Sequence, residues 1–72
     1  MKKVMFWAVG DTIVNEHLAA LTFQVIRVER QRSGNWIIMQ NVHSGEFING
    51  YEIGLQRMGY IGYRVDKTPV FA

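Results

Sequence analysis

The sequence lacks cysteine and has a single proline among its 72 residues. Without cysteine there is no disulfide framework and no thiolate metal site, which excludes the usual cross-linked small secreted scaffolds. A chain of this length forms one domain, which we expect to span residues 1–72. It buries only about 60% of the surface that its unfolded form exposes, so its stability should be modest.

Long hydrophobic runs and a strong excess of charge are lacking too. Residues 1–9 resemble the start of a secretory signal, but the apolar run stops at Gly10 and Asp11, and no small-residue cleavage site follows. No stretch approaches the roughly 20 apolar residues that a membrane-spanning helix needs. We therefore expect a soluble, cytoplasmic chain. Taken over the whole chain, the net charge of +2 argues only weakly for a nucleic-acid partner.

Charged residues are scarce at 19%, whereas hydrophobic residues make up 49% of the chain. A chain this short has a large surface for its volume, so some apolar area must stay exposed in a monomer. This composition favours an oligomer or a protein partner.

Short apolar segments separated by turn residues are what the sequence does contain. The turns lie at residues 33–35 and 44–46. In the segment before the first turn, the alternation of apolar side chains shifts phase between Val25 and Ile26, which either a β-bulge or a sharp coil of the strand produces. The pattern predicts an all-β fold, a small bent antiparallel barrel of about five or six strands. Its predicted core consists of Val14, Phe23, Val25, Ile38, Ile53, Leu55 and Ile61.

Residues 49–58 allow two interpretations. Asn49 and Gly50 are a strong signal for a two-residue hairpin turn. Alternatively, Asn49 caps a short helix, with Glu52 closing a variant capping box and Gly59 ending the helix. We favour the short helical turn.

The order of these elements resembles the Src-homology-3-like small barrel found in KOW and Tudor modules. The resemblance covers roughly residues 9–65 and rests on residues 9–14, 23–28, 36–38 and 44–46 and on Leu55. It implies a fold far more than a function, because such barrels carry many activities.

Catalysis is poorly supported by the sequence. His17 and His43 have no cysteine to partner them, and their spacing from Glu16 and Glu46 is not that of a metal site. An acid–base pair would need Asp11 to meet one of these glutamates, and nothing in the sequence places them within reach. The glycines form no phosphate-binding loop. We expect no enzymatic activity, no catalytic residue, no metal and no cofactor.

Basic and aromatic residues give the candidate binding residues. Arg27, Arg30 and Arg32 cluster near the first turn, and Trp36 is close to them across that turn. Arginines beside aromatic rings bind phosphates and stack on bases, although a solvated hairpin tip needs the same charges. The predicted residues for binding protein or nucleic acid are Trp7, Arg27, Arg30, Arg32, Trp36, Tyr63 and Arg64.

Aromatic residues exceed what a core this small can enclose. Because Phe6 and Trp7 are adjacent in a β-prone segment, their rings point to opposite faces, and one of them must be exposed. Tryptophan, tyrosine and arginine are enriched at interface hot spots. The leading hypothesis is a non-enzymatic binding module, a small regulator or inhibitor that recognises a protein partner. The alternative is a nucleic-acid-binding barrel. Residues 3–9 form the predicted edge strand of a homodimer.

Overall fold

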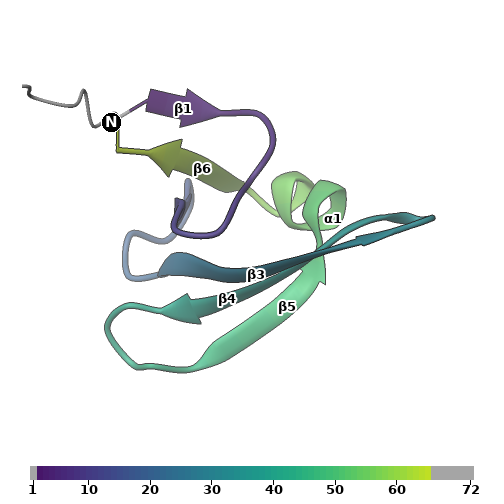
Figure 1. Cartoon of the computed structure of the whole chain (residues 1–72). Coiled ribbons are helices and arrows are strands. Elements are labelled where there is room, and N and C mark those ends of the chain that lie inside the picture. Colours follow the sequence, from purple (N-terminus) through teal and green to yellow (C-terminus); the bar gives the residue numbers. More distant parts are fainter. Residues whose placement is uncertain (1, 66–72) are drawn as a thin grey trace, which may run out of the picture.

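The computed structural model describes residues 2–65. In these residues, six strands form one antiparallel sheet and a short helix follows the fifth strand (Figure 1). In chain order the elements are β1 Lys2–Val4, β2 Thr12–Asn15, β3 Thr22–Gln31, β4 Gly34–Asn41, β5 Phe47–Tyr51, α1 Glu52–Arg57 and β6 Tyr60–Arg64.

The sheet is bent but open. Its strand order is β1-β6-β2-β3-β4-β5, so β1 and β5 are the two edges and do not pair with each other. Figure 1 shows β1 and β6 above β3, β4 and β5, with α1 to one side of them. The helix contacts β4, β5 and β6, so it bridges the two ends of the sheet. The predicted all-β fold with one short helix is confirmed, but the sheet does not close into a barrel.

A β-bulge in β3 accounts for the phase shift seen in the sequence. Val25 lies opposite Met39, whereas Arg27 lies opposite Ile38, so Ile26 is the extra residue. A bulge bends its strand and increases the local twist. Of the bulge and the sharp coil that the sequence allowed, the strand has the bulge. Beyond it the β3–β4 hairpin continues to a tip at Arg32 and Ser33 that projects from the molecule (Figure 1).

The segment that allowed two interpretations contains a strand and a helix. Asn49 and Gly50 lie within β5 and form neither a hairpin turn nor a cap. The helix begins at Glu52, and its N-cap is Tyr51, which makes no side-chain capping bond. Gly59 has φ of +94° and ends the helix, as expected. The predicted helix is present, but the predicted capping box is wrong because Glu52 is used elsewhere.

The core lies on the concave side of the bent sheet, beneath α1. Its buried apolar residues are Trp7, Ile13, Phe23, Val25, Ile37, Met39, Leu55 and Tyr60. The predictions for Phe23, Val25 and Leu55 are confirmed. The remaining predicted core residues are not fully buried: Val14, Ile38 and Ile61 are half-buried, and Ile53 is 57% exposed.

The core predictions for the strand residues Val14 and Ile38 are wrong for the same reason. Successive side chains in a strand point to opposite faces. Register places Ile13 and Ile37 on the inner face, so their neighbours Val14 and Ile38 point outward.

Two hydrogen bonds, one buried and one exposed, attach residues 5–7 to the helix. The Trp7 N–H donates to Glu52 Oε1 at 2.6 Å, and the Asn35 side-chain amide donates to Glu52 Oε2 at 3.2 Å. One turn further along the helix, Gln56 Nε2 donates to the Met5 carbonyl at 2.9 Å. The two helix residues that bind residues 5–7 are Glu52 and Gln56. They lie on one face of α1, because residues four apart in a helix are neighbours.

Candidate functional site

Trp7, a predicted binding residue, belongs to the core, where it is only 4% exposed. The ring packs against Gly62, where a Cβ atom would lie 2.5 Å from two of its atoms. The adjacent Phe6 is 73% exposed, in agreement with the expectation that one of the two rings must lie outside.

Arg64 forms an ion pair within the chain. Its Nε and Nη2 atoms donate to the two carboxylate oxygens of Asp11 at 2.8 and 3.0 Å, and the Ala8 N–H donates to Asp11 at 2.8 Å. Burial opposes ionisation of Asp11, but the hydrogen bonds from Arg64 and Ala8 outweigh it and lower the pKa of Asp11. This pair attaches the loop before β2 to β6, and it engages Arg64, a predicted binding residue, in a contact within the chain.

The other predicted arginines lie along the β3–β4 hairpin. Arg27 forms an exposed ion pair with Glu29, with Nε 3.1 Å from Oε1. Arg30 and Arg32 are exposed near the tip, and within residues 2–65 neither pairs with a carboxylate. The hairpin therefore presents two arginines to solvent.

Trp36 has an aromatic partner on the neighbouring strand. Its ring packs edge-to-face against Tyr51, with ring centroids 4.9 Å apart. The Tyr51 hydroxyl donates to Gln31 at 3.0 Å and accepts from the Ser33 hydroxyl at 2.8 Å. Bonds from the hairpin tip thus hold the Trp36–Tyr51 pair in place. Tyr63 lies apart from this pair, on β6 opposite Lys3 and Thr12.

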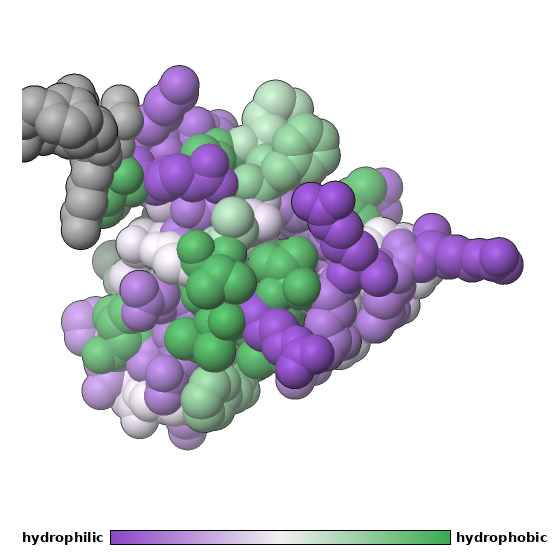
Figure 2. Space-filling view, viewed as in Figure 1, coloured by the Kyte–Doolittle hydropathy of each residue, from purple (hydrophilic) through white to green (hydrophobic). Residues whose placement is uncertain are grey.

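These rings belong to a larger apolar surface, which we call the outer face. It is the side of β3, β4 and β5 that points away from the core, and its apolar members are Ile26, Trp36, Ile38, Phe47 and Tyr51. Polar neighbours in the same cross-strand rows are Gln24, Arg27, Glu29, Gln40 and Asn49. Figure 2 shows apolar side chains gathered over these strands, with hydrophilic side chains beside them.

Exposure is greatest at two members of the outer face. Phe47 is 59% exposed and Ile26 at the bulge is 41% exposed, while Trp36, Ile38 and Tyr51 are half-buried. Of these five residues, only Trp36 is among the binding residues predicted from the sequence. The signal for Phe47 and Tyr51 is their pairing with β4, which becomes visible only once strand order and register are known.

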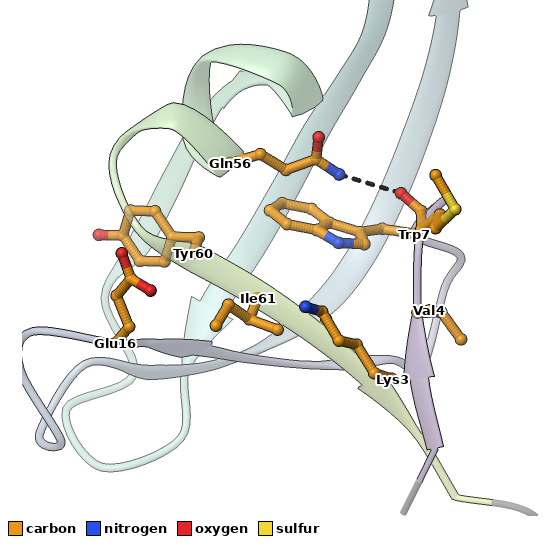
Figure 3. A pocket seen from close by; sticks show the side chains of 9 residues that line it. Lys3, Val4, Trp7, Glu16, Gln56, Tyr60 and Ile61 are labelled. Atoms are coloured by element: carbon orange, nitrogen blue, oxygen red, sulfur yellow. Dashed lines mark hydrogen bonds between the residues drawn. The ribbon is translucent and has the colours of Figure 1, made fainter.

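Apart from the outer face, the structure has a groove of about 310 Å³ between β1, β6 and α1 (Figure 3). Figure 3 shows the Trp7 ring between Gln56 and Ile61, with Lys3 and Glu16 on different sides of the groove. The lining mixes one ammonium, one carboxylate and apolar groups, and none of the predicted arginines contributes to it. The groove therefore does not form one site with the outer face.

The acidic residues and histidines weighed in the sequence do not form one cluster in the described residues. His17 Nε2 lies 3.3 Å from Glu16 Oε1 at the surface, while Asp11 is bound by Arg64. Among residues 2–65, no three histidine, aspartate or glutamate side chains are grouped so that they could hold a metal ion. In the same part of the chain, no helix is long and apolar enough to cross a membrane.

Comparison with known proteins gave no matching family model, no similar curated protein and no similar solved structure. The resemblance to the Src-homology-3-like barrel stays a prediction.

Proposed function

We propose that this chain is a non-enzymatic binding module, a small regulator or inhibitor that recognises a protein partner through its outer face. The observation that carries the proposal is the set of apolar and aromatic side chains on β3, β4 and β5, which no other element of residues 2–65 covers. An exposed apolar patch with polar neighbours is typical of a protein-interaction site.

The arrangement of Trp36 and Tyr51 supports the same proposal. Their edge-to-face contact and the hydrogen bonds of the Tyr51 hydroxyl fix both rings before any partner arrives. Because the rings are already ordered, binding costs less side-chain entropy. Tryptophan and tyrosine are the residues most often found at the centre of interface hot spots.

Nucleic-acid binding is the second candidate, and the exposed Arg30 and Arg32 favour it. They lie at the projecting end of the hairpin, where phosphate groups have free access. Trp36 supplies a nearby ring, but its packing against Tyr51 leaves only part of that ring available for stacking. We rank this candidate second for that reason.

Substitution of Ile26 by arginine tests the two candidates together. Ile26→Arg places a charge on the outer face, so we expect at least a tenfold loss of affinity for a captured protein partner, a cost of about 1.4 kcal/mol. Met58→Arg is the matched control, because Met58 is 64% exposed on the helix side of the molecule and the change in charge is the same. Affinity is measured by titration against the protein that the immobilised wild-type chain captures stoichiometrically from host lysate.

The nucleic-acid candidate predicts the opposite response to the added charge. Ile26→Arg would then retain or strengthen binding to mixed-sequence DNA and RNA, and removal of Arg30 and Arg32 would weaken it and reduce its salt dependence. No stoichiometric protein from lysate, or equal losses for Ile26→Arg and Met58→Arg, would contradict the protein-binding proposal. Circular dichroism confirms beforehand that each variant is folded.

A further inference from the structure

The two edges of the sheet differ in length and charge. β1 has three residues, two of which are the exposed Lys2 and Lys3. β5 has five residues, Phe47–Tyr51, none of them charged. Lysines on an edge strand oppose pairing with another chain, whereas an uncharged edge leaves its backbone groups available.

The far side of β5 is open within residues 2–65. β5 pairs only with β4, and no backbone group of Phe47–Tyr51 takes part in the turn and loop hydrogen bonds on its other side. Figure 1 shows no element beyond this strand. An unpaired row of N–H and C=O groups next to an exposed Phe47 is a template for one more strand.

The sequence of β5 is complementary to itself in antiparallel pairing. A two-fold axis at the central Asn49 would place each Phe47 opposite Tyr51 of the other copy, on the outer face. Aromatic pairs directly across two strands stabilise strand pairing. The two Asn49 amides would face each other and can exchange hydrogen bonds.

The inner face fits the same register. Each Ile48 would lie opposite Gly50 of the other copy, a large residue against one without a side chain. Leu55 of α1 fills the space beside Gly50, 3.4 Å from where a Cβ atom would be. The half-buried Ile48 would therefore gain an apolar neighbour from the second copy.

We propose that the chain forms a homodimer in which β5 pairs antiparallel with β5 of a second copy around Asn49. The pairing joins the two sheets into one and brings the two outer faces side by side. It differs from the dimer predicted from the sequence, which used residues 3–9. It rests on the open edge of β5 and not on the proposed partner binding, although Phe47 and Tyr51 belong to both; Ile26 belongs to the outer face alone.

Substitution of Asn49 by lysine tests this dimer. Asn49 is exposed, so the monomer tolerates the change, but in the dimer two ammonium groups would face each other at the axis. Sedimentation equilibrium of the wild type should show concentration-dependent dimerisation, and Asn49→Lys should lose it. Gln24→Lys is the matched control, since Gln24 is exposed on β3, inside the sheet, and that variant should still dimerise.

Cross-linking gives a second measurement that does not depend on dimer strength. The chain has no cysteine, so Asn49→Cys introduces a single thiol. Residues directly opposite in antiparallel strands have Cβ atoms about 4.5–5.5 Å apart, near the distance of a disulfide. Mild oxidation should convert Asn49→Cys to a covalent dimer much faster than Gln24→Cys.

Three results would overturn the proposal. They are a wild type that stays monomeric up to the concentrations used for NMR, a dimer that survives Asn49→Lys, and equal rates of oxidation for the two cysteine variants. Survival of the dimer would point instead to the β1 edge. Loss of partner capture in Ile26→Arg with the dimer intact would separate this proposal from the binding function.

Discussion

Single residues decide how closely the parts of this small core approach one another. Gly62 on β6 has ordinary negative φ but no room for a side chain, because the Trp7 ring and Ile13 lie against its Cα. Gly54 in α1 is the opposite case, since nothing lies within 4 Å of where its Cβ would be. Packing therefore requires a glycine at position 62 but not at position 54.

Alanine at these two glycines should change stability in opposite directions. Gly62→Ala forces a Cβ to 2.5 Å from the rigid Trp7 ring, and we expect a loss of about 1–3 kcal/mol in the free energy of unfolding. Gly54→Ala adds a better helix former without a clash and should gain about 0.5–1 kcal/mol. Urea unfolding of both variants measures the difference. Equal effects would contradict the assigned packing of Trp7 on Gly62.

Sequence periodicity predicted a β-bulge or sharp coil in β3 and the helix, but not which side of β4 faces inward. Trp36, Ile37, Ile38 and Met39 are all apolar, so alternation gives no phase, and only the register with β3 and β5 selects Ile37 and Met39 for the core. In β3, by contrast, Gln24 marks one face, and the positions of Phe23 and Val25 were predicted correctly.

The candidate site, like the core, was predicted only in part from the sequence. The arginines of the hairpin are neighbours in sequence, so a local pattern found them. Burial of Trp7 depends on Gly62, and the aromatic pair depends on Tyr51 packing against Trp36 across two strands. Such contacts between distant parts of the chain leave no local periodic signal.

The loop before β2 is attached to β6 by the Asp11–Arg64 ion pair, which makes stability depend on pH. The pKa of Asp11 is lowered from its ordinary value of 3.8, so the folded chain binds this proton less readily than the unfolded chain. The pair therefore stabilises the fold at pH values above about 4 and loses its contribution as the pH falls through the lowered pKa.

Arg64→Gln should reduce this acid sensitivity. We expect the variant to be less stable than the wild type at neutral pH, and the difference between the two should shrink as the pH falls below about 4. Thermal unfolding over this range provides the measurement, and subtracting the variant from the wild type removes the contribution of the other carboxylates. A constant difference across the acid range would show that Arg64 does not lower the pKa of Asp11.

At the scale of the whole molecule, three separate segments complete one core around the open sheet. Trp7 comes from the connection between β1 and β2, Leu55 from α1, and Tyr60 from β6, where it packs edge-to-face against Phe23 of β3 at 5.9 Å. The buried carboxylate of Glu52 joins the first of these segments to the second. If one of these segments detached, apolar surface of the other two would become exposed to water. We therefore expect the sheet, the helix and residues 5–7 to unfold together.

Cooperative unfolding can be measured with Trp7 as the probe once Trp36 is replaced. In Trp36→Phe, fluorescence reports only Trp7, and far-UV circular dichroism reports the sheet and the helix. We expect the two signals to give one coincident urea transition, as two-state unfolding requires. In a Trp36→Phe/Glu52→Leu double variant, the Trp7 N–H loses its acceptor, and both transitions should move together to lower urea by an amount equivalent to about 1–3 kcal/mol. If the fluorescence transition comes first while the circular dichroism signal stays in place, residues 5–7 detach on their own. The open sheet would then not depend on Trp7 for its stability.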